Sequence, residues 1–363
     1  MSAANERSSD MNRSVTSTVR AKADTAVAEQ LPPEAEGAGH GRFGWSVGVL
    51  RLDRYSGLYL GVLLVVVFSV VSPETFATVS NARVVAASSA IAGILTLAVV
   101  VSMAAGTFDI SLAANMTFSI CLLGSLVTDQ GLAWPLAVVV TVVAGALIGA
   151  ANAVVITRFG VEPIVATLGM SSVLAALSFW VADGQTILLE GVAPSFTDAG
   201  SASIASVPIT VFYLVGLAVV LWFLLEHTPF GRYLYAIGSN AQAARLAGIK
   251  VMRLQALTLM LTGALAALAG VVLTMQLGAA SFGAGSPYLL PAFAAAFLGS
   301  TQILPGRFNV RGTIVALYLL AIAVKGLQLS FPELPWIKDL VSGLVLIVAV
   351  SITARAVKQR NTR

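Results

Sequence analysis

Reactive side chains are scarce in this chain. Among 363 residues there are one cysteine and two histidines, and only 10% of the residues are charged. A single cysteine, Cys121, excludes an intrachain disulfide, and His40 and His227 leave little material for a metal site. No Gly-Lys pair occurs, which excludes a nucleotide-binding P-loop, and the paired histidines of a zincin are also absent. We therefore expect this chain to be no enzyme and to bind neither a metal nor a cofactor.

Apolar residues dominate instead. Hydrophobic side chains make up 57% of the chain and the mean hydropathy is +0.89, which leaves too few polar groups to coat a soluble globule. Runs of roughly 17 to 25 apolar residues match a bilayer core of about 30 Å. The candidate spans are 57–72, 85–106, 110–128, 135–157, 164–182, 207–225, 254–276, 288–304, 312–330 and 337–353. The sequence predicts an all-α, polytopic transmembrane helix bundle of about ten spans, embedded in a lipid bilayer.

Basic residues in the connections predict the orientation of these spans. Lys and Arg concentrate in short cytoplasmic loops, and an even number of spans puts both termini on one side. With both termini cytoplasmic, only Arg83, Lys325 and Lys338 fall on the outer side or at outer helix ends. The net charge of +4 therefore indicates membrane topology, and we expect no nucleic-acid partner.

Composition divides the chain into three regions. Residues 1–41 mix charges of both signs with small residues, prolines and glycines, which predicts a disordered cytoplasmic tail. Residues 42–353 form the transmembrane domain, and 354–363 form a basic cytoplasmic tail.

Two charged residues lie inside or beside predicted spans. A charged side chain at the centre of a span raises the free energy of membrane insertion by about 2.5 to 3.5 kcal/mol. Asp109 either caps the helix that follows it by accepting backbone amides, or marks a broken helix beside a solute cavity. Lys325 either snorkels to the outer interface or is a buried counter-ion. An ion-coupled carrier is expected to hold more intramembrane carboxylates than this.

A polar, basic island at 229–249 separates two membrane-length apolar runs. Pro229, Gly231 and Gly238 are expected to break the preceding helix into a turn. Ser239 or Asn240 can then cap a short helix over 241–247, which Gly248 ends in left-handed geometry. From the residues alone, the island is either a docking element for another protein or an ordinary cytoplasmic loop.

Four segments together resemble a known family. The run GRYLYAIGSNAQAARLAGI at 231–249 is similar to the coupling loop of the inner-membrane permease subunits of bacterial ABC sugar importers, the ribose, xylose and arabinose type. GTFDIS at 106–111 resembles the family's GGIDLS, and 152–169, with ITRFGV and ATLG, resembles its fourth-to-fifth helix connection. LGST at 298–301, with PGR at 305–307 and GT at 312–313, matches a late family segment. The resemblance extends over about 57–353.

The resemblance implies a permease domain with a coupling loop at 226–253, working in the bacterial inner (plasma) membrane as a homodimer or beside a paralogue. It implies two cytoplasmic ATPase subunits, which hold the ATP and Mg²⁺, and a periplasmic sugar-binding protein. The ATPase-coupling residues carried over are Gly231, Arg232, Gly238, Asn240, Ala243, Ala244 and Gly248. The cargo expected is a monosaccharide, with a pentose such as ribose as the leading candidate.

This chain also departs from the family pattern. The family's late Gly-Gly stretch is replaced by 302–306, and Lys325 stands where the family has an uncharged polar residue. Sugar recognition needs amide and hydroxyl partners with an aromatic face. Candidate substrate-pathway residues are Asp109, Asn115, Phe118, Asn152, Thr167, Gln276 and Gln328. Each polar member can equally be an interhelical hydrogen-bonding group. The rival functions are an ion-coupled secondary carrier of a small neutral solute, and a membrane anchor or receptor without a transport role.

Overall fold

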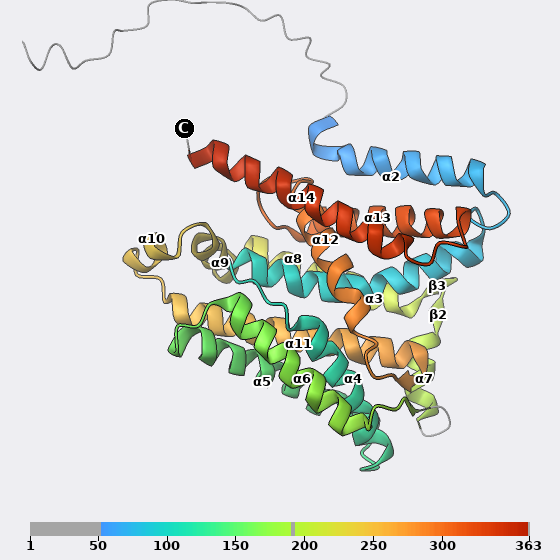
Figure 1. Ribbon diagram of the computed structural model, residues 1–363, viewed down its shortest axis with the longest axis horizontal. Coiled ribbons are helices and arrows are strands. Elements are labelled where there is room, and N and C mark those ends of the chain that lie inside the picture. The colour runs from blue at the N-terminus through green and yellow to red at the C-terminus, as the bar shows by residue number, and fades with distance from the viewer. Residues whose placement is uncertain (1–51, 190–192, 362–363) are drawn as a thin grey trace, which may run out of the picture. The chain divides into compact units, whose positions relative to one another are not determined.

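The computed structural model of the protein describes residues 52–189 and 193–361, with side chains described for 57–189 and 193–351. The expected tail at 1–41 lies outside the described residues. In chain order the elements are α2 (Leu52–Val71), α3 (Val79–Ala104), α4 (Leu112–Thr128), α5 (Trp134–Arg158), α6 (Pro163–Ala182), β1 (Ile187–Leu188), α7 (Pro194–Ser201), β2 (Ser203–Ile204), β3 (Val207–Pro208), α8 (Ile209–His227), α9 (Pro229–Ser239), α10 (Ala241–Leu246), α11 (Val251–Leu277), β4 (Ala279–Ala280), η1 (Ser286–Tyr288), α12 (Leu289–Gly299), α13 (Val310–Ser330) and α14 (Ile337–Asn361) (Figure 1).

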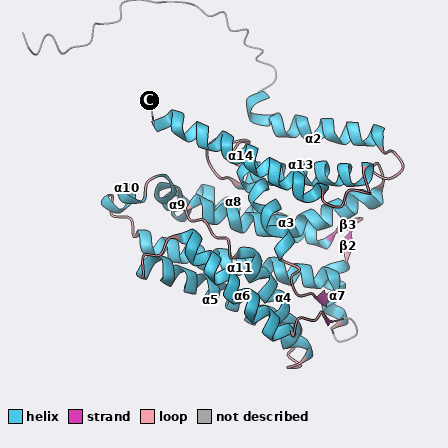
Figure 2. Cartoon of the chain, viewed as in Figure 1, coloured by secondary structure: helices cyan, strands magenta, loops and turns pink. Residues whose placement is uncertain are grey.

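The described part of the chain is a helix bundle, as predicted. Two short antiparallel sheets, which the sequence did not indicate, add β1 paired with β4 and β2 paired with β3 (Figure 2). Each predicted span contains a helix, and within the described residues six helices are long and apolar enough to cross a membrane: α3, α5, α6, α8, α11 and α13. The total of ten spans remains a prediction.

Two helices differ in length from the runs that predicted them. The run 288–304 yields only the 11-residue helix α12, because the chain leaves the helix after Gly299 and forms a loop up to Asn309, the cap of α13. Helix α14, in contrast, is longer than its predicted run 337–353. It continues to Asn361, through most of the range expected to be a basic tail.

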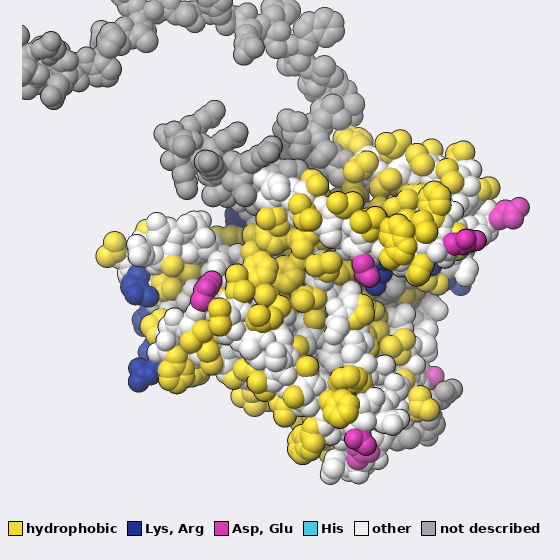
Figure 3. Space-filling view, in the orientation of Figure 1, with side chains coloured by type: hydrophobic (Ala, Val, Ile, Leu, Met, Phe, Trp, Pro, Cys, Tyr) yellow, Lys and Arg dark blue, Asp and Glu magenta, His cyan; other side chains and the backbone are white. Residues whose placement is uncertain are grey.

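Helices α3 and α11 lie at the centre of the bundle. α3 packs against α4, α8, α11, α12 and α13, and α11 packs against α5, α4 and α7. Glycines allow the α5–α11 contact: a methyl group on Gly149 or Gly263 would overlap the backbone of the opposite helix. Such close approach favours helix association where lipid gives helices no hydrophobic drive to associate. Outward-facing side chains are largely apolar (Figure 3).

Connections between the helices meet at two ends of the bundle. At one, here called the α10 end, the 228–250 connection contacts both 104–106 and 307–308. At the other, here called the distal end, β1 pairs with β4, and Trp134 Nε1 donates to Ser195 Oγ at 3.0 Å. Alternate connections therefore share an end, which is the arrangement expected if successive helices cross a bilayer in opposite directions. Figure 3 shows Lys and Arg side chains gathered near α10.

Candidate functional site

The segment expected to be a turn is the amphipathic helix α9. Pro229 lies in its first turn, where the missing N–H costs nothing. Gly231, Leu234 and Ile237 are buried against the bundle, and a side chain on Gly231 would overlap the backbone of Leu225. The prediction of a turn was wrong because these glycines provide close helix packing, which overrides their weak helix propensity.

Helix α10 follows as predicted. The Oδ1 of Asn240 accepts the backbone amides of Gln242 and Ala243, both at 3.0 Å, and so caps the helix. Gly248 follows it with a φ of +83°, in the left-handed region that glycine adopts without strain. The short helix is thus defined at both ends by its own sequence.

The two sides of α10 have different surroundings. Ala244 is only 5% exposed and packs with Ile237 and Val251, which holds α10 on the bundle. Leu246, two residues later and therefore on the opposite side, is 91% exposed. Ala243 is also exposed, as are Arg232 of α9 and Gln242. Ala244, which the resemblance implies as an ATPase-coupling residue, is thus buried within this chain, whereas the exposed Leu246 was not named from the sequence. The signal was a lone leucine on a helix otherwise made of alanine and polar residues.

The end of α9 lies directly against the connection between α3 and α4. A methyl group on Gly238 would lie 2.5 Å from the carbonyl oxygen of Ala104, and one on Gly106 would lie 3.0 Å from the Cα of Gly238. Gly106 itself has a φ of +70°. Gly238 therefore serves an internal contact, and its role is to let α9 approach the α3–α4 break.

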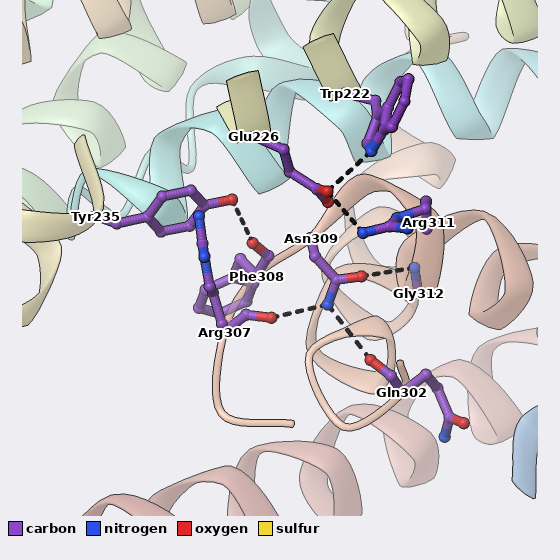
Figure 4. Close-up of polar contacts among 9 residues, drawn as sticks. All are labelled: Trp222, Glu226, Tyr235, Gln302, Arg307, Phe308, Asn309, Arg311 and Gly312. Carbon is purple, nitrogen blue, oxygen red and sulfur yellow. Dashed lines mark hydrogen bonds and ion pairs between the residues drawn. The ribbon is translucent and has the colours of Figure 1, made fainter. Parts of the chain in front are cut away.

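A polar cluster joins α9 to the loop before α13 (Figure 4). The Tyr235 hydroxyl donates to the Phe308 carbonyl at 2.7 Å, and the Arg307 guanidinium lies 3.5 Å from the centre of the Tyr235 ring. Burial raises the pKa of the Tyr235 phenol, and the charge of Arg307 opposes this shift, so the hydroxyl remains a donor at neutral pH. The Asn309 Oδ1 accepts the Gly312 amide at 2.7 Å and caps α13.

An ion pair ties α8 to α13 beside this cluster. Arg311 Nη2 lies 2.6 Å from Glu226 Oε2, which also accepts from Trp222 Nε1 at 2.9 Å. Glu226 is 14% exposed and Arg311 is 47% exposed, so solvent screens the pair in part. None of these three residues was selected from the sequence, because the partners are about 85 positions apart along the chain.

Three of the predicted pathway residues meet at the α3–α4 break. Asp109 Oδ1 accepts the Ser111 amide at 2.9 Å and the Ser111 hydroxyl at 2.6 Å, and Asn152 Nδ2 donates to Ser111 Oγ at 2.8 Å. The Ile110 amide donates to Thr167 Oγ1 at 3.2 Å. Helix α4 begins at Leu112 with Ser111 as its N-cap residue, so Asp109 lies two residues before the cap position and bonds the cap residue itself. The broken helix is present as a buried polar turn at 105–111.

The other pathway candidates are dispersed. Asn115 donates to the carbonyls of Gly145 and Gly263, at 3.2 and 3.3 Å, and so links three helices. Phe118 is half-buried on α4. Gln276 and Gln328 line two separate cavities at the distal end.

Comparisons with known proteins place this helix bundle among transport permeases. Residues 81–350 match the family model described as branched-chain amino acid transport system / permease component. The chain is 33% identical over 304 residues to the ribose import permease protein RbsC of Bacillus subtilis (strain 168), covering 83% of this chain and 91% of that one. It is 25% identical over 300 residues to the D-allose transport system permease protein AlsC of Escherichia coli (strain K12), with shares of 83% and 91%.

A third relative is the fructose import permease protein FrcC of Rhizobium meliloti, 28% identical over 297 residues, which cover 80% of this chain and 82% of the relative. No solved structure matches the chain. The resemblance to sugar-importer permeases, which rested on four sequence segments, is confirmed. The chain is a multi-pass membrane protein that belongs to the branched-chain amino acid transport system / permease component family.

Proposed function

We propose that this chain is the permease subunit of an ATP-binding-cassette importer that carries a monosaccharide, with a pentose such as ribose as the first candidate, into the cytoplasm across the bacterial inner membrane. The observation that carries the proposal is α10: a capped helix, fixed to the bundle on one side and presenting the 91% exposed Leu246 on the other. The relatives named for ribose, allose and fructose import support the choice of cargo class.

The α10 end has the properties of a cytoplasmic docking face. Its exposed basic residues include Arg158, Arg232, Arg245, Lys250 and Arg253, in accordance with the positive-inside rule. Leu246, the last residue of this short helix, is an exposed apolar side chain whose burial by a partner would be favourable. We assign that partner to two ATPase subunits, one for each permease of a dimer, because no P-loop occurs in this chain.

The residues of this chain then transmit movement and do no chemistry on the sugar. ATP-driven closure of the ATPase pair would displace α10 and α9 together, since Ala244 and Ile237 pack in one cluster. The polar cluster of Tyr235 and Arg307 would pass the displacement to the loop before α13. Access to the bundle would switch from outward to inward as a shift between two populated states. A periplasmic binding protein would deliver the sugar to the distal end.

Reconstitution in proteoliposomes tests this function. The permease is reconstituted alone, and separately with its ATPase subunits and binding protein, and the uptake of labelled ribose is measured with ATP inside. The same uptake measurement, repeated with labelled allose and labelled fructose in place of ribose, identifies which sugar is carried. We expect uptake only in the complete system, unchanged by an uncoupler while ATP is held constant.

Two results would contradict the proposal. Uptake by the permease alone that collapses with the ion gradient would indicate a secondary carrier. A complete system that hydrolyses ATP but accumulates no sugar, with any neutral or acidic monosaccharide tried, would indicate an anchor or receptor role.

A further inference from the structure

Two adjoining cavities open at the distal end of the bundle, beside the start of α3. The first has a volume of about 330 Å³ and the second about 340 Å³, within the range of roughly 300 to 1,000 Å³ typical of small-ligand pockets. Val84 and Ser88 of α3 line both, so the cavities share a wall. The residues used below are Tyr288, Lys325 and Lys338 in the first cavity and Arg83, Thr210 and Gln276 in the second.

The basic side chains of these cavities are unusual for their end of the bundle. Arg83, Lys325 and Lys338 are the three basic residues that fall on the predicted outer side, where the positive-inside rule disfavours them. All three line the cavities, and no described residue in either lining carries a carboxylate. Among the described residues, none of the three has an ion-pair partner. Within the described part of the chain, their positive charge is thus not paired with a carboxylate, and Lys338 Nζ lies 5.9 Å from the centre of the Tyr288 ring.

Uncharged polar atoms in the second cavity also lack partners. Thr210 is fully buried, and its hydroxyl makes no hydrogen bond within the described residues. The buried Oε1 of Gln276 is likewise unpaired and can only accept a hydrogen bond. Buried polar groups in native proteins are nearly always satisfied, so an unpaired hydroxyl and an unpaired amide oxygen on two residues of one cavity wall indicate a place where a ligand can supply the missing partners. Both atoms are buried in this conformation, so the two side chains must turn toward the cavity to reach a ligand.

We propose that these cavities form a binding site for a molecule that carries an anionic group beside hydroxyl groups. The two lysines and Arg83 would pair with a carboxylate or phosphate. Gln276 would accept from a ligand hydroxyl and Thr210 would exchange a hydrogen bond with another. Two sources share this chemistry: a sugar acid on the outer side, and the phosphoglycerol head group of an anionic phospholipid.

Binding is measured on the purified full chain in phosphatidylcholine nanodiscs, without ATPase subunits. D-glucuronate and D-glucose are titrated calorimetrically as a charged and a neutral probe of the same shape class. For the lipid source, nanodiscs of equal phosphatidylcholine and phosphatidylglycerol are used, and retained lipid is identified by native mass spectrometry.

In the wild type we expect glucuronate to bind at least tenfold more tightly than glucose, or phosphatidylglycerol to be selectively retained. The double variant Lys325→Gln with Lys338→Gln should weaken that binding at least tenfold. Lys325→Arg, which keeps the charge, should stay within threefold of the wild type. Arg158→Gln, the matched control at the α10 end, should have no effect.

Thr210→Val gives a separate test that does not alter charge. Because the Thr210 hydroxyl has no partner to lose, the thermal midpoint of the unliganded protein should not fall, whereas glucuronate or phosphatidylglycerol binding should weaken severalfold. The proposal is overturned if neither ligand prefers the wild type over the double lysine variant.

The two positive outcomes have different meanings. Glucuronate binding would move the cargo from neutral pentoses to sugar acids, an assignment that rests on the proposed transport function, whereas the binding measurement itself does not. Retention of phosphatidylglycerol alone would identify a structural lipid site and would leave the cargo unchanged.

Discussion

Replacement of Leu246 by serine tests the docking role of α10 most directly. The side chain is 91% exposed, so the substitution removes almost no packing inside the permease. If an ATPase cleft buries it, the lost burial is about 1.5 to 3 kcal/mol. Since 1.4 kcal/mol corresponds to a tenfold change in Kd, Leu246→Ser should weaken ATPase binding roughly 10- to 100-fold.

The assay is binding of the detergent-solubilised permease to immobilised ATPase subunits, followed by ATP-driven uptake in proteoliposomes. Uptake should fall at low ATPase concentration and recover at high concentration, because only affinity is lost. Leu188→Ser is the matched control, since Leu188 is 67% exposed at the distal end. Wild-type affinity for the Leu246 variant would refute the docking role. Ala244→Trp is a poor probe, because Ala244 holds α10 on the bundle.

Three further substitutions test the attachment of α9 and α13. Gly238→Ala places a methyl group 2.5 Å from the carbonyl oxygen of Ala104, the last residue of α3, and should lower the unfolding free energy in micelles by about 1 to 3 kcal/mol. Gly169→Ala is the control, because the space around Gly169 is open, and it should not lower the unfolding free energy. Tyr235→Phe loses the bond to Phe308 and should cost about 0.5 to 1.5 kcal/mol; an unchanged unfolding free energy would show that the bond contributes nothing. Asn309→Ala removes the α13 cap and should cost about 1 to 2 kcal/mol. Asn309→Ser, which retains an uncharged acceptor oxygen at the cap position, should recover part of this loss in the same unfolding assay. Asn309→Asp should not, because it turns an anionic oxygen toward the carbonyls that Nδ2 now contacts.

The transmembrane helices could be predicted because the bilayer imposes a single requirement on them. A run of apolar residues of sufficient length must form a helix, since unpaired backbone groups are not tolerated in lipid. Helix α10 was equally predictable, because Asn240 and Gly248 define its ends locally. In contrast, α9 was missed because its glycines are explained only by packing: Gly231 contacts the backbone of Leu225 in the preceding helix, and Gly238 contacts that of Ala104, which is distant in the chain.

Individual contact residues were harder to predict for the same reason. Ala244 and Leu246 belong to one short helix, and only the packing of Ile237 and Val251 decides which of the two faces outward. Arg83 and Lys325 appeared in the sequence as separate exceptions to the charge rule. Their placement in adjoining cavities depends on how α3 and α13 pack, which no local pattern contains.

The approach of Gly106 to Gly238 has a mechanical consequence. A side chain between two segments can absorb a small displacement by changing its rotamer, and neither glycine has one. The end of α9 and the turn at 105–111 are therefore in direct backbone contact, with no side chain between them that could adjust to a displacement. When α9 moves, the turn that holds Asp109 must follow it or the two must separate, and the addition of a single methyl group is enough to hold them apart.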